Sequence, residues 1–86
     1  MNEKALETNF HESIKDMEEA ILTDLSSLKK GYGSRKWAIS ERVGIPVDIL
    51  TVLLKRLKSN GKVELIMIWS DDGLPNGSGY CLKGSQ

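Results

Sequence analysis

Hydrophobic residues recur at helical spacing between residues 46 and 59, and this segment organises the chain. Because successive residues of an α-helix are rotated by about 100°, these apolar side chains share one face, which must be buried. Pro46 suits the first turn of such a helix, and Gly61 suits the left-handed position just past its last turn. We therefore predict a helix over residues 46–59. Its buried face comprises Leu50, Leu53, Leu54 and Leu57, with Ile45 just before it.

A longer amphipathic segment precedes it. Asn9, with Glu12 three residues later, has the spacing of a helix N-cap pair. An apolar stripe then continues for about five turns, and Lys29-Lys30-Gly31 would give a cationic last turn and a glycine stop. We predict a surface helix that begins after Asn9, preceded by a flexible segment at residues 1–8. The stripe consists of Phe10, Ile14, Met17, Ile21, Leu25 and Leu28.

A short helix connects these two segments. Gly31-Tyr32-Gly33 interrupts the chain, and Ser34 is the expected N-cap of a helix that ends at Arg42. Residues 43–46 then form a tight turn that contains Gly44. A helix, a glycine-containing turn of three or four residues and a second helix make up a helix-turn-helix.

The period changes after Gly61. Val63, Leu65, Met67 and Trp69 alternate with their neighbours, which predicts a strand over residues 63–70 with Trp69 facing the core or supporting the hairpin. Residues 71–79 are dense in turn formers, and residues 80–82 are the expected return strand. The predicted fold class is α+β, with three helices followed by a two-stranded β-hairpin. The predicted single domain spans residues 9–83, with a tail at residues 84–86.

Charge is distributed unevenly, although the 86-residue chain has 12 basic and 12 acidic residues. The net charge is −5 over residues 1–28, +7 over residues 29–62 and −2 over the remainder. A local basic surface matters more for binding a polyanion than the total charge does. The alternative is that the basic middle third pairs with the acidic first helix within one monomer.

Composition argues against catalysis and metal binding. His11 and Cys81 are the only residues of their types, and they lie 70 positions apart with no orienting partner. We expect His11 to face solvent and Cys81 to be a small buried hydrophobe. The longest apolar run, residues 65–69, is far shorter than the roughly 20 residues that cross a bilayer. We therefore expect a cytoplasmic non-enzyme with no cofactor, metal, small-molecule substrate or membrane association.

The run Ile39-Ser40-Glu41-Arg42-Val43-Gly44-Ile45, followed by spaced leucines, Asn60-Gly61 and Val63, resembles the winged-helix DNA-binding domains of bacterial transcription regulators. The resemblance covers residues 10 to 83. It implies that residues 46–59 are the recognition helix, that Ser34, Arg35 and Lys36 touch the phosphate backbone, and that residues 71–79 are the wing. It implies double-stranded DNA as the partner.

The predicted helix gives this expectation mixed support. Lys55 and Arg56 can neutralise phosphates, and Thr51 can hydrogen-bond a base edge. No Asn, Gln or Arg lies in the first two turns to make a bidentate base contact, and the wing carries Asp71 and Asp72 without a basic residue. The expected DNA-binding residues on this helix are Val47, Asp48, Thr51, Val52, Lys55, Arg56 and Lys58.

The alternative function is a protein-interaction module. Ile49 and Val52 are apolar where recognition helices usually present polar groups, so they could form a patch for a protein partner or a second copy of the chain. Trp37 either joins this patch or, as we expect, packs between the first two helices. The long first helix could serve in dimerisation.

Overall fold

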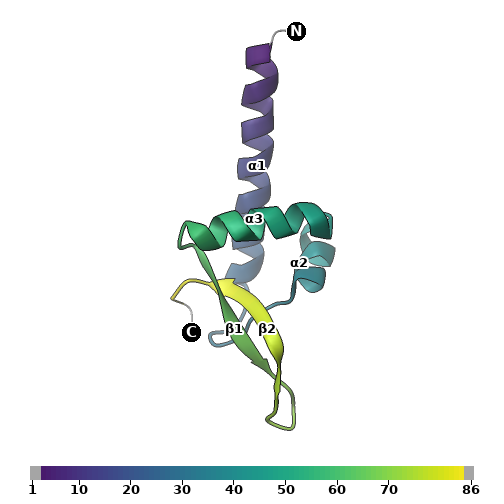
Figure 1. Cartoon of the computed structure of the whole chain (residues 1–86), viewed down its shortest axis with the longest axis vertical. Helices are drawn as coiled ribbons and strands as arrows, with labels where there is room; N and C mark the ends of the chain where they lie inside the picture. The colour runs from purple at the N-terminus through teal and green to yellow at the C-terminus, as the bar shows by residue number, and fades with distance from the viewer. Residues whose placement is uncertain (1–2, 85–86) are drawn as a thin grey trace.

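The computed structural model describes the backbone of residues 3–84 and the side chains of residues 13–84. Three helices precede a two-stranded antiparallel hairpin, which confirms the predicted layout (Figure 1). Ser85 and Gln86, in the expected tail, lie outside the described residues, as does the side chain of His11. The elements are α1 (Glu3–Ser26), α2 (Lys36–Val43), α3 (Val47–Ser59), β1 (Val63–Trp69) and β2 (Pro75–Leu82).

α1 differs from its prediction at both ends. It begins at Glu3, so Asn9 is inside the helix and is not its N-cap, and residues 3–8 have helical backbone. It ends at Ser26, so Lys29 and Lys30 lie beyond it and do not form a cationic last turn. The hydroxyl of Ser26 donates to the Thr23 carbonyl oxygen at 2.6 Å. Serine side chains that bond nearby carbonyls compete with helical hydrogen bonds, which is consistent with an end at this point.

The hydrophobic core lies where α3 crosses α1 (Figure 1). The leucine face predicted for α3 is buried as expected, because Leu50 and Leu54 are fully inaccessible to solvent. Gly61 follows the helix with φ of +73°, the left-handed conformation that the sequence predicted. The core residues are Ile21, Leu25, Ile39, Ile45, Leu50, Leu53, Leu54, Leu57 and Val63.

α2 begins one residue later than the predicted start. Arg35 occupies the N-cap position without a capping hydrogen bond from its side chain, so the expectation that Ser34 caps this helix is wrong. Gly44 closes the helix with φ of +74°, and its N–H donates to the Ser40 carbonyl oxygen. The Ser40 hydroxyl donates to the Ile45 carbonyl oxygen at 2.6 Å. The turn between α2 and α3 is therefore held by hydrogen bonds from both its backbone and a side chain.

The hairpin is longer than predicted. β2 begins at Pro75, five residues before the expected start of the return strand, and only residues 70–74 connect the strands. Ser34 forms an isolated antiparallel bridge with Tyr80, through N–H to oxygen hydrogen bonds of 2.8 and 2.7 Å. A Cβ on Gly79 would lie 2.8 Å from the Ser34 nitrogen. A glycine is therefore needed where the loop before α2 crosses the hairpin.

The alternating face of β1 is not buried beyond its first residue. Val63 belongs to the core, whereas Leu65, Met67 and Trp69 are 41%, 50% and 61% exposed. Of the two alternatives for Trp69, the one in which it faces the core is therefore wrong, and a role in supporting the hairpin stays a prediction. The hairpin extends away from the helices (Figure 1), so no helix covers this face of the strand near its tip.

Candidate functional site

α3 has a buried face and two exposed flanks. The 100° rotation per residue separates Val47 and Thr51 on one flank from Ile49 and Arg56 on the other. Both flanks are accessible, because Val47 and Ile49 are 44% and 43% exposed. All the residues of α3 that the sequence proposed for DNA contact are exposed, and they divide between the two flanks.

The first flank, which we call the polar flank, consists of Val47, Thr51, Lys55 and Lys58, with Lys36 beside it. Lys36 in the first turn of α2 donates from Nζ to Thr51 Oγ1 at 3.4 Å, which brings α2 and α3 together here. Thr51 Oγ1 donates to the Val47 carbonyl oxygen at 2.8 Å. No ion pair within the described chain involves Lys36, Lys55 or Lys58. The polar flank and the neighbouring Lys36 therefore present three cationic side chains that no carboxylate of the described residues neutralises.

The second flank faces α1 across an open groove of about 390 Å³. Apolar side chains from both helices line it, with Asp48 and Arg56 as the charged members. Val52, at its α3 side, is 59% exposed. An exposed apolar groove of this kind is typical of a protein contact rather than of a phosphate contact. The apolar residues of this α1–α3 groove are Ile14, Met17, Ile49, Val52 and Leu53.

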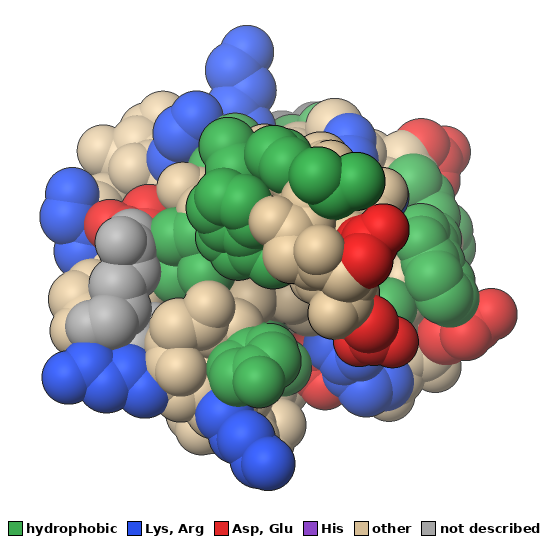
Figure 2. Space-filling view, turned by 90° about the horizontal axis from the view of Figure 1, so that it is seen from below, with side chains coloured by type: hydrophobic (Ala, Val, Ile, Leu, Met, Phe, Trp, Pro, Cys, Tyr) green, Lys and Arg blue, Asp and Glu red, His purple; other side chains and the backbone are tan. Residues whose placement is uncertain are grey.

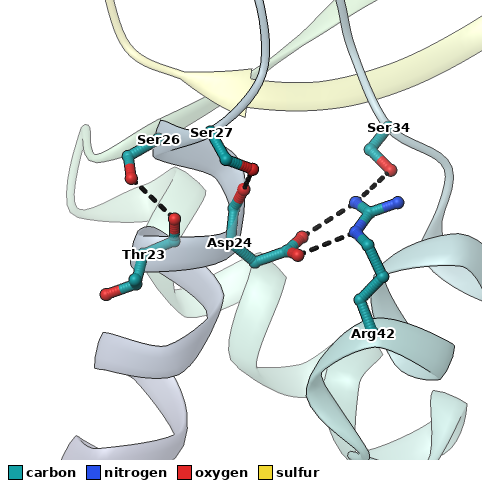
Figure 3. A network of polar contacts seen from close by, with 6 residues as sticks. All are labelled: Thr23, Asp24, Ser26, Ser27, Ser34 and Arg42. Carbon is teal, nitrogen blue, oxygen red and sulfur yellow. Dashed lines mark hydrogen bonds and ion pairs between the residues drawn. The ribbon is translucent and has the colours of Figure 1, made fainter.

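α1 neutralises part of the basic middle third. Arg42 donates from Nε and Nη2 to the two carboxylate oxygens of Asp24 at 2.7 and 2.8 Å, and also from Nη2 to the Ser34 hydroxyl at 2.7 Å (Figure 3). The hydrogen bond to Asp24 raises the pKa of Arg42 above its ordinary value. Arg56 lies 3.7 Å from Glu18. Pairing with the acidic first helix therefore occurs at Arg42 and Arg56 but leaves the polar flank unpaired within the described residues.

The three residues expected to touch phosphate before α2 have different surroundings. Ser34 is only 6% exposed, and its hydroxyl accepts the hydrogen bond from Arg42. Arg35 donates to the Asn76 carbonyl oxygen on β2. Lys36 alone of the three points to α3. Ser34 is thus a structural link between α1, α2 and the hairpin. The sequence alone could not predict this role, because it depends on the contact between Ser34 and Tyr80.

The hairpin tip combines acidic and apolar side chains. Figure 2, which views this end of the molecule, shows hydrophobic side chains next to acidic ones. Leu74 is 60% exposed, and Asp71 and Asp72 are exposed beside it. A hydrogen bond from the Ser70 hydroxyl lowers the pKa of Asp72 below its ordinary value. The tip therefore offers negative charge where a DNA-contacting wing would offer positive charge.

Three aromatic side chains, Tyr32, Trp37 and Trp69, are exposed. Trp37 is 60% exposed, so the expectation that it packs between the first two helices is wrong. Tyr32 and Trp69 are 63% and 61% exposed and line a hollow of about 430 Å³ together with Met67. The turn signal at Gly31-Tyr32-Gly33 indicated an exposed loop, but no local pattern could bring Tyr32 to the hairpin.

No cluster of three or more His, Cys, Asp or Glu side chains among the described residues could hold a metal ion. No described helix combines the length and apolar character that a membrane span needs. No family model matches the chain, and no curated protein or solved structure matches it either.

Proposed function

We propose that this chain binds duplex DNA through the polar flank of α3, as a small transcriptional regulator. One observation carries the proposal: Lys55 and Lys58 lie on the exposed polar flank of α3, Lys36 of α2 lies beside it, and no carboxylate is paired to these lysines within the described residues. When unpaired lysines neutralise DNA phosphates, the counterions condensed on the DNA are released, and this release drives association. The regulator role rests on the resemblance to winged-helix domains.

The expected mode places α3 in the major groove. An α-helix fits that groove, and the exposed polar flank provides Thr51 for a base edge and Val47 for a thymine methyl. Asp48, in the first turn, is the residue least suited to a phosphate. With no bidentate side chain on this flank, we expect binding that depends mainly on the phosphate backbone and discriminates weakly among sequences.

Protein interaction is the second candidate function. The α1–α3 groove favours it, since its lining is almost entirely apolar and both Ile49 and Val52 are exposed. Trp37 on α2 is exposed as well, but it does not line this groove. Because the groove and the polar flank are different surfaces, the two functions do not compete for the same residues.

Fluorescence anisotropy with a labelled random duplex at a series of salt concentrations tests DNA binding. We expect affinity to fall steeply with salt, and the double variant Lys55→Ala with Lys58→Ala to reduce the log–log slope by about 1.8, since each lost phosphate contact removes about 0.9. The matched control is Lys15→Ala with Lys62→Ala, which removes two charges beside Glu18 and Glu19 instead. Binding that is independent of salt, or equal losses in the two double variants, would refute the proposal.

A further inference from the structure

We infer that the free edge of β1 and the hollow at its end bind an extended peptide, which adds a strand to the hairpin and places an arginine side chain in the hollow. This aromatic hollow is the space of about 430 Å³ lined by residues 31–33 and 67–71. It lies apart from the polar flank of α3, so the inference does not depend on DNA binding. The edge supplies unpaired backbone groups, and the hollow supplies aromatic rings and negative charge.

β1 has a partner strand on one edge only within the described chain. It pairs with β2, and the isolated bridge between Ser34 and Tyr80 lies on the other side of β2. An unpaired strand edge is a template for one more strand, which an extended peptide can supply. β1 itself contains no Lys or Arg, so a second copy that paired through this strand would bring no guanidinium to the hollow.

The direction of the backbone groups along β1 identifies the free ones. The Lys83 N–H donates to the Lys62 carbonyl oxygen at 3.0 Å, and backbone groups point alternately to either side of an antiparallel strand. The N–H and carbonyl groups of Leu65 and Met67 therefore point away from β2. No backbone group of the described residues meets them on that side. Both residues are thus available to a peptide strand.

Tyr32 and Trp69 bring two aromatic rings to the hollow, and both are largely exposed. A Cβ on Gly33 would lie 2.9 Å from Ile66 Cγ1, so a glycine is needed where the loop that carries Tyr32 approaches β1. Aromatic faces attract cations, and the planar guanidinium of arginine stacks on them. The volume of the hollow is within the range of about 300–1,000 Å³ that is usual for ligand pockets.

The charged side chain that lines the hollow is acidic. Asp71 belongs to the lining, and no Lys or Arg of the described residues forms an ion pair with it. Asp72 is exposed next to it in the sequence. Figure 2 shows acidic and hydrophobic side chains together at this end of the molecule. A guanidinium above the rings can therefore also form a charge-assisted hydrogen bond to a carboxylate.

The basic residues of the adjoining segments do not line the hollow. Lys29-Lys30 precedes the loop of Tyr32, and Arg35 donates to a carbonyl oxygen of β2. Lys62 and Lys83 lie at the end of the hairpin opposite its tip. Positive charge at one end and acidic residues at the other place the arginine of the peptide at the tip.

NMR titration of the full chain with a threonine-rich peptide that carries one central arginine tests the site. The chain offers a matched pair of tryptophans, because Trp69 and Trp37 are 61% and 60% exposed. We expect the indole N–H signal of Trp69 and the amide signals of Leu65 and Met67 to shift, while the indole signal of Trp37 does not. Equal shifts of the two indoles, or no shift of Trp69 with millimolar peptide, would overturn the proposal.

Substitutions at exposed positions test the hollow without disturbing the core. Trp69→Ala should raise the dissociation constant of the peptide about tenfold, whereas Trp37→Ala should leave it unchanged. Asp71→Asn should reduce the preference for the arginine peptide over the same peptide with citrulline, a neutral isostere of arginine. Equal affinity of the wild-type chain for the two peptides would refute the placement of a guanidinium in the hollow.

N-methylation of alternate peptide residues tests strand addition without changing the protein. One of the two alternating sets removes the donors that face β1 and should abolish binding, whereas the other set faces away and should be tolerated. Equal tolerance of both methylated peptides would refute strand addition. Self-association of the chain that is lost in Trp69→Ala would assign the surface to a second copy, and a shift of the Trp69 indole with duplex DNA alone would assign it to DNA; either result overturns the proposal.

Discussion

The two exposed flanks of α3 belong to one helix and differ in chemistry. The flank next to α2 presents Thr51 and lysines with no ion-pair partner in the described chain. The flank next to α1 presents Ile49 and Val52 above an apolar groove, and its cation Arg56 is already close to Glu18. A single helix can therefore offer a polyanion and a protein two separate surfaces. Glu18 of α1 pairs with Arg56 on one flank, whereas no carboxylate of the described residues pairs with the lysines of the other.

The largest expected effect is on the free energy of unfolding, and it distinguishes a substitution on the buried face of α3 from one on its flanks. Leu54→Ala removes a fully buried side chain from the core and should reduce the free energy of unfolding by about 3 kcal/mol. Val52→Ala, at a position 59% exposed, should change it by less than about 0.5 kcal/mol in the monomer. Urea unfolding at low protein concentration measures both. A large loss for Val52→Ala would mean that the groove is part of the core.

The next largest effect is expected on DNA binding, when the adjacent cations Lys55 and Arg56, which lie on different flanks of α3, are substituted in turn. Lys55→Ala should weaken duplex binding about tenfold at low salt and reduce the slope of log affinity against log salt by about 0.9. Arg56→Ala should leave both quantities nearly unchanged, because its guanidinium lies on the α1 side near Glu18. Salt-dependent anisotropy titrations distinguish the variants. If Arg56→Ala has the larger effect, the flank next to α1 is the DNA surface.

The smallest expected effect is on the free energy of unfolding, when the ion pairs that α1 makes with Arg42 of α2 and Arg56 of α3 are removed. Asp24→Ala removes a bidentate partner of Arg42 and should reduce the free energy of unfolding by about 1 kcal/mol. Glu18→Ala should cost less than about 0.5 kcal/mol, since its contact with the half-exposed Arg56 is 3.7 Å long. Thermal or urea unfolding provides the comparison. Equal costs would show that the geometry of these pairs does not determine their contribution.

The helical part of the fold could be predicted from local pattern, because its burial follows the spacing of apolar residues. The four leucines of α3 and the left-handed Gly61 lie as the sequence indicated. Helix ends were less predictable: Asn9 and Ser34 have the chemistry of N-caps, but neither occupies that position. Side-chain propensity alone does not decide a boundary when the chain can continue the helix or pair elsewhere.

Long-range contacts account for the remaining differences. Alternation in β1 correctly predicted a strand, but which face is covered depends on how far the hairpin extends past the helices, and this left Trp69 exposed. Ser34 forms a bridge to Tyr80, which joins segments 46 residues apart in sequence. The division of α3 into two flanks likewise required the positions of α1 and α2.

The most direct test of the two-flank account is a methyl NMR spectrum of the chain during titration with a short random DNA duplex. Val47 and Val52 are a matched pair of exposed valines on opposite flanks of the same helix. The account predicts that the methyl signals of Val47 and Thr51 shift with added duplex, while those of Val52 and Ile49 do not. Shifts confined to Val52 and Ile49, or equal shifts at all four residues, would contradict it.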